Sequence, residues 1–186
     1  MELCGDEEMA GLVRALQSDG SNDLAEVDRL VQRFPDDPRL QFMRGSILAG
    51  RQQPLEAHSA LTRAVQLAPE FHIARYQLGF FELTSGEVDR ALSTWGPLQR
   101  LPADFYLRKF VDGLIHLVRD EFRDALALLR EGIALNRENE PVNNDIRLLI
   151  QECEKLPRKS GDADLASDLS ATSVLLGQFG YKPSEH

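Results

Sequence analysis

Apolar residues recur along the middle of this chain at the spacing of α-helices. Two segments carry an apolar stripe at intervals of three and four residues, and each has a second stripe beside the first. The first stripes are Ile73, Tyr76, Phe80 and Leu83, and Leu107, Phe110, Leu114 and Leu117. The second are Ala74, Leu78 and Phe81, and Val111, Ile115 and Val118. This period predicts helices rather than strands, and a helix that is apolar on two faces is expected to pack on two sides.

Proline and glycine divide this pattern into a series of short helices. Asp37-Pro38 begins one helix in cap-then-proline order, and Gly50 ends it. We predict helices over 8–18, 23–33, 38–49, 54–67, 72–84, 87–100, 105–118 and 121–134, and an amphipathic helix over 141–155. Pro97 lies inside the predicted helix 87–100, where it removes a backbone hydrogen bond. We therefore expect a kink or an early end at that proline.

Small residues recur with a fixed period of 34 residues. Four glycines keep this interval, Gly11, Gly45, Gly79 and Gly113. The same interval separates Ala57, Ala91 and Ala125, then Leu61, Trp95 and Leu129, and also Pro35 and Pro69. A fixed period of this length is typical of stacked helix–turn–helix repeats. Because glycine inside a helix costs up to about 1 kcal/mol relative to alanine, we predict close helix crossings at Gly45, Gly79 and Gly113.

The segment from Leu78 to Trp95 resembles the tetratricopeptide repeat consensus. Leu78 and Gly79 match its Leu-Gly pair, and Gly86 matches its turn glycine. Ala91 and Trp95 match the alanine and the bulky residue of its second helix. The resemblance implies an all-α fold, a right-handed superhelix of stacked helix–turn–helix repeats. It also implies that the first helix of each repeat lines a concave, peptide-binding groove.

On this resemblance, we expect a helical repeat domain over 1–155 and a linker with a C-terminal tail over 156–186. The repeats would fall at about 4–37, 38–71, 72–105 and 106–139, followed by a capping helix over 141–155. Asp23 replaces the repeated alanine in the first repeat, as expected of a terminal repeat with a solvated outer face. Several positions of the first helices are polar where the family is usually apolar: Gln41, Arg44, Arg75, Glu82, Lys109, Asp112 and His116.

The resemblance assigns nine apolar residues to the groove. They are Phe42, Ile73, Tyr76, Phe80, Leu83, Leu107, Phe110, Leu114 and Leu117. An apolar groove favours a protein partner that presents an apolar helix or extended segment, and we expect the main anchors at Tyr76, Phe80, Phe110 and Leu114. In the alternative interpretation, both apolar faces are consumed by packing inside the superhelix.

The C-terminal tail carries a complementary stripe. Leu165, Leu169, Thr172, Leu176 and Phe179 would share one face of a helix. An apolar groove is a liability in a soluble protein unless it is covered. We therefore hypothesise that the tail docks in the groove through Leu165, Leu169, Leu176 and Phe179, either in its own chain or in a second copy.

Composition and charge exclude several other classes of protein. The formal net charge is −9, which argues against a nucleic-acid-binding or membrane surface, since both require a positive face. The N-terminal residues are acidic where a secretory signal would be basic, and no apolar run approaches the roughly 20 residues of a membrane span. We therefore expect a cytoplasmic protein.

The sequence offers no recognisable catalytic or metal-binding pattern. Cys4 and Cys153 have no cysteine neighbour at metal-ligand spacing, so they are expected to be buried or idle thiols. No histidine is paired with a Cys, Asp or Glu at ligand or triad spacing, and the glycines follow the repeat rather than a phosphate loop. Trp95 occupies a repeat core position. We predict a non-enzyme without cofactor or metal.

The predicted function is therefore protein–protein interaction, as an adaptor or assembly factor. Two alternatives remain open at this point. In the first alternative, the chain is a homodimer or an autoinhibited scaffold in which the tail fills the groove. In the second, it is a regulatory subunit of a separate enzyme.

Overall fold

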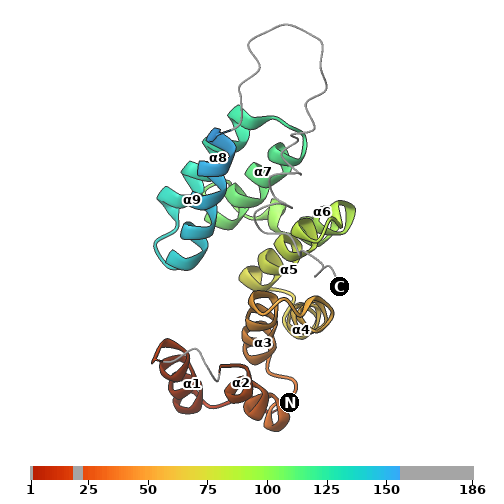
Figure 1. The fold of residues 1–186 in the computed structure, drawn as a ribbon, viewed down its shortest axis with the longest axis vertical. Coiled ribbons are helices and arrows are strands. Elements are labelled where there is room, and N and C mark those ends of the chain that lie inside the picture. The colour runs from red at the N-terminus through yellow and green to blue at the C-terminus, as the bar shows by residue number, and fades with distance from the viewer. Residues whose placement is uncertain (1, 19–22, 156–186) are drawn as a thin grey trace, which may run out of the picture. The chain divides into compact units, whose positions relative to one another are not determined.

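The computed structural model describes residues 2–18 and 23–155, which form nine α-helices, a short 3-10 helix and no strand (Figure 1). The elements are α1 (Asp6–Ser18), α2 (Asp23–Arg33), α3 (Pro38–Gly50), α4 (Pro54–Leu67), α5 (His72–Thr84), α6 (Val88–Trp95), η2 (Leu98–Arg100), α7 (Tyr106–Val118), α8 (Phe122–Leu135) and α9 (Glu140–Lys155). The prediction of an all-α fold is confirmed, and every helix except α6 begins and ends within two residues of its predicted bounds.

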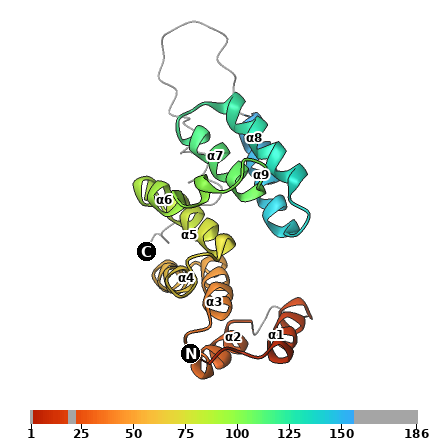
Figure 2. The same cartoon turned by 180° about the vertical axis from the view of Figure 1, so that it is seen from behind.

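The helices belong to two compact units. The N-terminal unit comprises Met1–Phe81, and the C-terminal unit begins at Glu82, so that α5 runs across the boundary. Each unit is described separately below. In the N-terminal unit α2 packs on α3 and α3 on α4, and in the C-terminal unit α7 packs on α8 and α8 on α9 (Figures 1 and 2).

The predicted interruption at Pro97 is confirmed. Helix α6 ends at Trp95, and the chain continues through Gly96 and Pro97 into η2. The pyrrolidine ring has no N–H to donate and clashes with the preceding turn, so the α-helix cannot continue through this residue. The second helix of this hairpin is consequently eight residues long, against fourteen for both α4 and α8.

Two of the repeated glycines bring the helices of a hairpin into close contact, as predicted. A Cβ atom built on Gly45 of α3 would lie 2.7 Å from Cγ of Leu61 and 3.0 Å from its backbone nitrogen, on α4. A Cβ on Gly113 of α7 would lie 2.9 Å from Leu129 and 3.2 Å from the carbonyl oxygen of Ala125, on α8. The leucines and the alanine are the residues that keep the 34-residue interval, so the period in the sequence reflects this crossing.

Gly11 keeps the 34-residue interval but is not at a helix crossing. A Cβ atom built there meets no described atom within 4 Å. Helix α1 packs through Met9, Leu12 and Leu16, which share one face. Gly11 lies about a quarter of a turn away from Leu12 on the helix, outside that face.

The turns inside the hairpins repeat the same backbone geometry. Gln52, Gly86 and Asp120 have left-handed φ angles of 58°, 86° and 59°. The following residue donates its N–H to a carbonyl five positions earlier, at 2.9–3.0 Å: Gln53 to Leu48, Glu87 to Glu82, and Glu121 to His116. This is the Schellman arrangement that ends a helix. The repeat is therefore present in the backbone even where the turn residue is not glycine.

Because Gly45 lies at a helix crossing and Gly11 does not, replacing each with alanine should change the free energy of unfolding in opposite directions. Gly45→Ala is expected to lower the free energy of unfolding by about 1–2 kcal/mol, because overpacking against Leu61 outweighs the gain in helix propensity. Gly11→Ala gains the propensity without a clash and is expected to raise it by up to about 1 kcal/mol. Urea unfolding followed by circular dichroism measures both. If both variants lost a similar amount of stability, the distinction between Gly45 at a helix crossing and Gly11 outside one would be contradicted.

A buried carboxylate fixes the beginning of α3 in the N-terminal unit. Asp37 is fully buried, and its side chain accepts the backbone N–H of Arg39 at 2.9 Å as the N-cap. Its other oxygen accepts the Arg39 guanidinium at 2.7 Å and the backbone N–H of Cys4 at 3.0 Å. The same guanidinium donates to the carbonyl of Cys4 at 2.6 Å. The segment before α1 is thus held to the start of α3 by two residues.

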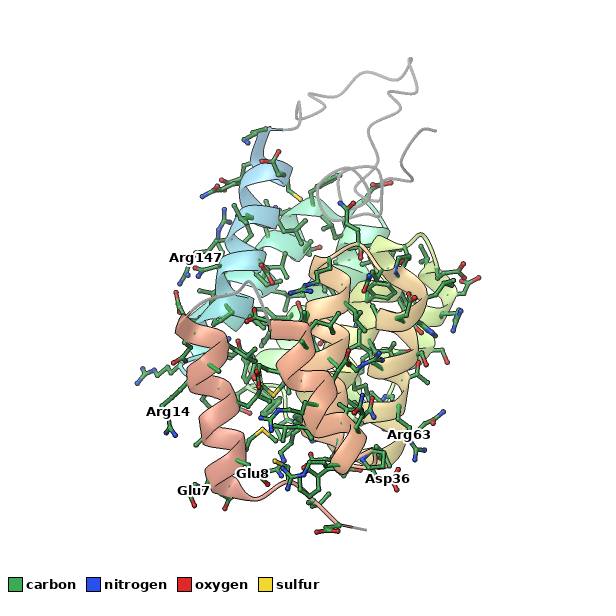
Figure 3. The ribbon with its side chains drawn as sticks, turned by 60° about the horizontal axis from the view of Figure 1, so that its bottom comes forward. Glu7, Glu8, Arg14, Asp36, Arg63 and Arg147 are labelled. Atoms are coloured by element: carbon green, nitrogen blue, oxygen red, sulfur yellow. The ribbon has the colours of Figure 1, made fainter. Side chains whose placement is uncertain are left out.

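Ion pairs at the surface of the N-terminal unit join neighbouring elements. Arg33 of α2 contacts Glu8 of α1 at 2.6 Å, and Arg63 of α4 contacts Asp36 in the turn before α3. Figure 3 shows Asp36 and Arg63 lying together. Exposed pairs of this kind contribute at most about 1 kcal/mol each, so the core and the buried Asp37 matter more.

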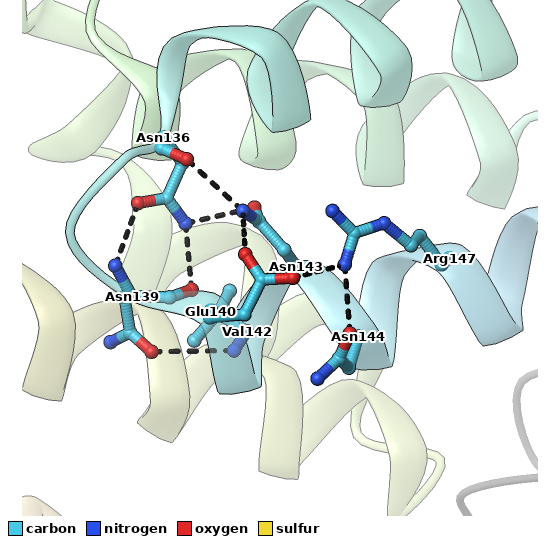
Figure 4. Close-up of polar contacts among 7 residues, drawn as sticks. All are labelled: Asn136, Asn139, Glu140, Val142, Asn143, Asn144 and Arg147. Atoms are coloured by element: carbon cyan, nitrogen blue, oxygen red, sulfur yellow. Dashed lines mark hydrogen bonds and ion pairs between the residues drawn. The ribbon is translucent and has the colours of Figure 1, made fainter.

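A network of asparagines forms the turn between α8 and α9 in the C-terminal unit (Figure 4). The buried Asn136 donates to the carbonyl of Asn139 and to the side chain of Asn143, both at 2.9 Å. Asn143, also buried, donates back to the carbonyl of Asn136 at 3.0 Å and to Glu140 at 3.1 Å. Arg147 then pairs with Glu140. The side chains thus satisfy the polar groups of the turn. Helix α9 buries one apolar face, as expected of an amphipathic helix: Val142, Ile146, Leu149, Ile150 and Cys153.

Candidate protein-binding surface

The predicted groove residues of the N-terminal unit lie on α3 and α5 and retain some exposure. Phe42, Ile73 and Phe80 are half-buried, whereas Tyr76 is buried. The ring of Phe42 meets that of Phe71 edge-on at 5.3 Å, and the rings of Tyr76 and Phe80 stack at 6.1 Å. The first helices of this unit therefore present aromatic and aliphatic side chains that are packed on one another and only partly covered.

The predicted groove residues of the C-terminal unit are almost fully buried. Leu83, Leu107, Phe110, Leu114 and Leu117 expose at most 1% of their surface. These residues are therefore packed inside the C-terminal unit, as the alternative interpretation expects, and do not present a free surface there.

Two sides of α7 have identified neighbours within the C-terminal unit. The side facing α8 carries Gly113, against Leu129, and Lys109, which pairs with Glu131 at 2.7 Å. The side facing η2 carries Arg108, which donates to the carbonyl of Leu101 at 2.6 Å. On the same side, Asp112 accepts a hydrogen bond from Gln99 at 3.4 Å. These contacts define the orientation of the helix.

The ring of Phe110 contributes to the α7–α8 hairpin. A Cβ atom built on Gly132 of α8 would lie 2.5 Å from the ring of Phe110. The ring therefore occupies the space that a side chain at position 132 would need. Phe110 was predicted as an anchor for a partner, and its contact with Gly132 shows that it also supports the hairpin. The signal that could have identified this contact is Gly132 itself, a glycine inside a helix without an obvious cause.

The polar residues at positions that the family usually fills with apolar ones have polar partners. The buried Gln41 donates to the carbonyl of Pro35 at 2.8 Å, and Arg44 pairs with Asp28 of α2 at 2.6 Å. The buried Glu82 accepts the hydroxyl of Thr94 on α6 at 2.6 Å. In these cases hydrogen bonds between neighbouring elements replace apolar contacts of the consensus.

The two cysteine thiols are buried and not activated. Both cysteines are free and buried, as predicted. Burial raises the pKa of the Cys153 thiol to about 11, with contributions from Glu152 and Glu154, and burial likewise raises the pKa of Cys4. Both thiols are therefore protonated at neutral pH, and a protonated thiol is a poor nucleophile and metal ligand.

Within residues 2–18 and 23–155, no group of three or more His, Cys, Asp and Glu side chains is placed to hold a metal ion. In the same part of the chain, no helix has the length and apolarity needed to cross a bilayer.

The predicted docking residues of the tail, Leu165, Leu169, Leu176 and Phe179, lie outside the described residues. The division into a domain over 1–155 and a tail over 156–186 stays a prediction. The two polar clusters at Asp37 and at Asn136 were not predicted from the sequence. The Asp-Pro pair that begins α3 was a signal for a cap, but nothing in it pointed to Cys4.

Comparison with known families supports the repeat architecture. The sequence model of the tetratricopeptide repeat family matches residues 42–96, from α3 to the end of α6. No curated protein and no solved structure matches the chain. Repeats of this family generally mediate protein–protein interactions and are typically non-catalytic. The turns shared by the hairpins and the helix crossings at Gly45 and Gly113 agree with this match, so residues 42–96 are similar to tetratricopeptide repeats.

Proposed function

We propose that this protein is an adaptor or assembly factor that binds an apolar helix or extended segment of a protein partner. The proposed binding residues are those of the first helices of the N-terminal unit: Phe42, Ile73, Tyr76 and Phe80.

The observation that carries this proposal is the partial exposure of Phe42, Ile73 and Phe80 on α3 and α5. All three lie inside the segment that matches the repeat family. Helix-in-groove recognition uses apolar anchors spaced along one helix face, and aromatic residues are common hot spots of such interfaces. The cytoplasmic setting expected from the sequence fits such a role.

A display library of 15–20-residue peptides, selected against the full-length chain, tests this role. We expect selected peptides to carry apolar residues at helical spacing. Ile73→Asp is expected to weaken the affinity of a selected peptide at least tenfold, because an unpaired carboxylate would be buried in the contact. Fluorescence anisotropy with the labelled peptide measures the dissociation constant.

Leu55→Asp is the matched control. Leu55 lies at the start of α4, a second helix, and exposes 83% of its surface. The same change of charge there should leave the affinity within twofold of wild type. Equal loss in both variants, or selected peptides that are acidic and without apolar anchors, would contradict the proposed surface.

A further inference from the structure

An exposed carboxylate of α1 borders the proposed binding surface of the N-terminal unit. Asp6 lies 3.6 Å from the guanidinium of Arg39, and the side chain of Asp6 is fully exposed. Arg39 is three residues, close to one turn, before Phe42 on α3, so these two residues share a side of that helix. Asp6 therefore lies at the end of the surface where α3 begins.

A second exposed carboxylate, that of Glu70, comes from the turn before α5. It lies 3.8 Å from the imidazole of His72, and the side chain of Glu70 is 92% exposed. His72 is four residues, about one turn, before Tyr76, which belongs to the proposed surface. The ring of Phe42 meets the ring of the residue that directly precedes α5. The beginnings of α3 and α5 therefore lie together, and Glu70 borders the same end of the surface as Asp6.

The basic side chains of α3 and α5 are engaged in local contacts. Arg39 pairs with the buried Asp37 at 2.7 Å, so the group around its single guanidinium contains two carboxylates and carries a net negative charge. Arg44 pairs with α2 at 2.6 Å, and Arg75 donates to a backbone carbonyl in the turn before α5 at 3.1 Å. Each of these two arginines is two residues from a surface residue of its helix, nearly half a turn away. This end of the surface is therefore acidic.

We propose that the partner segment is a basic amphipathic helix. Its apolar side packs on Phe42, Ile73 and Phe80, and Lys or Arg residues at one of its ends pair with Asp6 and Glu70. Complementary charge at the border of an apolar contact selects among partners and sets their orientation. This inference rests on the proposed function, since it names the chemistry of the segment that binds there.

Peptide selection with two forms of the full-length chain tests this chemistry. The same display library is selected against wild type and against Asp6→Asn with Glu70→Gln. We expect wild type to enrich Lys and Arg at one end of the apolar peptides, and the double variant to enrich the same apolar anchors without them. The matched control is Glu26→Gln with Glu56→Gln, which removes two exposed carboxylates from α2 and from the first turn of α4. It should select the same peptides as wild type.

The affinity of a labelled peptide selected on wild type gives the size of the effect. In Asp6→Asn with Glu70→Gln, its dissociation constant is expected to rise about three- to tenfold at about 50 mM salt, because an exposed ion pair contributes up to about fivefold. The difference should shrink at about 0.5 M salt, since salt screens charges at a surface. The matched control should stay within about twofold of wild type at both salt concentrations.

Equal dissociation constants in wild type and in Asp6→Asn with Glu70→Gln would overturn the inference, and so would an equal loss in the matched control. Selected peptides with apolar anchors and no enrichment of Lys or Arg would also contradict the basic partner. If Ile73→Asp still weakened the binding of such peptides, the proposed function would remain intact. Failure to select any apolar peptide would instead contradict the proposed function, and the inference with it.

Discussion

Asp37→Ala is expected to lower the free energy of unfolding by about 2–4 kcal/mol, the combined loss of a helix N-cap and of buried hydrogen bonds to a charged acceptor. The carboxylate is fully buried and accepts hydrogen bonds from Arg39 and from the backbone of Cys4. Without it, α3 loses its N-cap and the amide of Cys4 loses its acceptor. Urea unfolding followed by circular dichroism at pH 7 measures the loss.

The acid dependence provides an independent check. Burial by itself raises the pKa of Asp37, but the hydrogen bonds from Arg39 and Cys4 outweigh it and hold the pKa below its ordinary value. Because the folded-state pKa is lowered, the stabilisation is present above the unfolded-state pKa of about 3.9 and is lost as the pH falls through the folded value. The difference between wild type and Asp37→Ala should therefore narrow below about pH 4.

Asp36→Ala is the matched control for this prediction. Asp36 is the preceding residue and pairs with Arg63 at the surface, where both side chains are more than 40% exposed. Its removal should cost less than about 1 kcal/mol. A similar loss in both variants, or a constant difference between wild type and Asp37→Ala from pH 7 to pH 3, would contradict the role of Asp37.

The helices could be predicted because local signals agree with tertiary packing. Gly45 and Gly113 mark the positions where two helices of a hairpin touch, and Pro97 ends α6 by its own covalent structure. Gly11 keeps the same interval without a crossing. The period therefore identifies the register of the repeat, while contact at a given residue depends on which face of the helix its neighbours cover.

The backbone conformation of the turns could be predicted from the sequence only in part. Gly86 could be recognised as a turn residue because glycine adopts a positive φ without a steric penalty. Gln52 and Asp120 have the same backbone conformation in the same register, although glutamine rarely adopts a positive φ and aspartate adopts it less readily than glycine. Their conformation follows from the packing of the hairpins, which imposes the same turn on all three.

The sequence was sufficient to identify the apolar residues of the predicted surface. It was not sufficient to tell which of these residues are exposed and which are buried. The stripes on α5 and α7 have the same spacing, yet Ile73 and Phe80 are half-buried and Leu114 and Leu117 are buried. Burial depends on what packs against each stripe, and periodicity contains no information on that. The direction of the Phe110 ring toward Gly132 is likewise set by α8.

Trp95→Ala is expected to lower the free energy of unfolding by about 3–5 kcal/mol, because its side chain is fully buried in the C-terminal unit. Helix α6 has only eight residues, so it depends on packing rather than on its own hydrogen bonds. Trp95→Phe keeps part of the buried volume and should lose less. Ser93→Ala, at an exposed position of the same helix, should change the stability by less than about 0.5 kcal/mol.

The same urea unfolding experiment separates a core role for Trp95 from a role in stacking on a ligand. A tryptophan whose role is to stack on a bound ligand can be replaced with little loss of stability, whereas a tryptophan in the core cannot. If Trp95→Ala unfolds at the urea concentration of Ser93→Ala, its burial contributes little. The short α6 would then have to be held by other contacts. We expect instead that Trp95→Ala unfolds at the lowest urea concentration of the three variants, since no other substitution among them removes a buried side chain entirely.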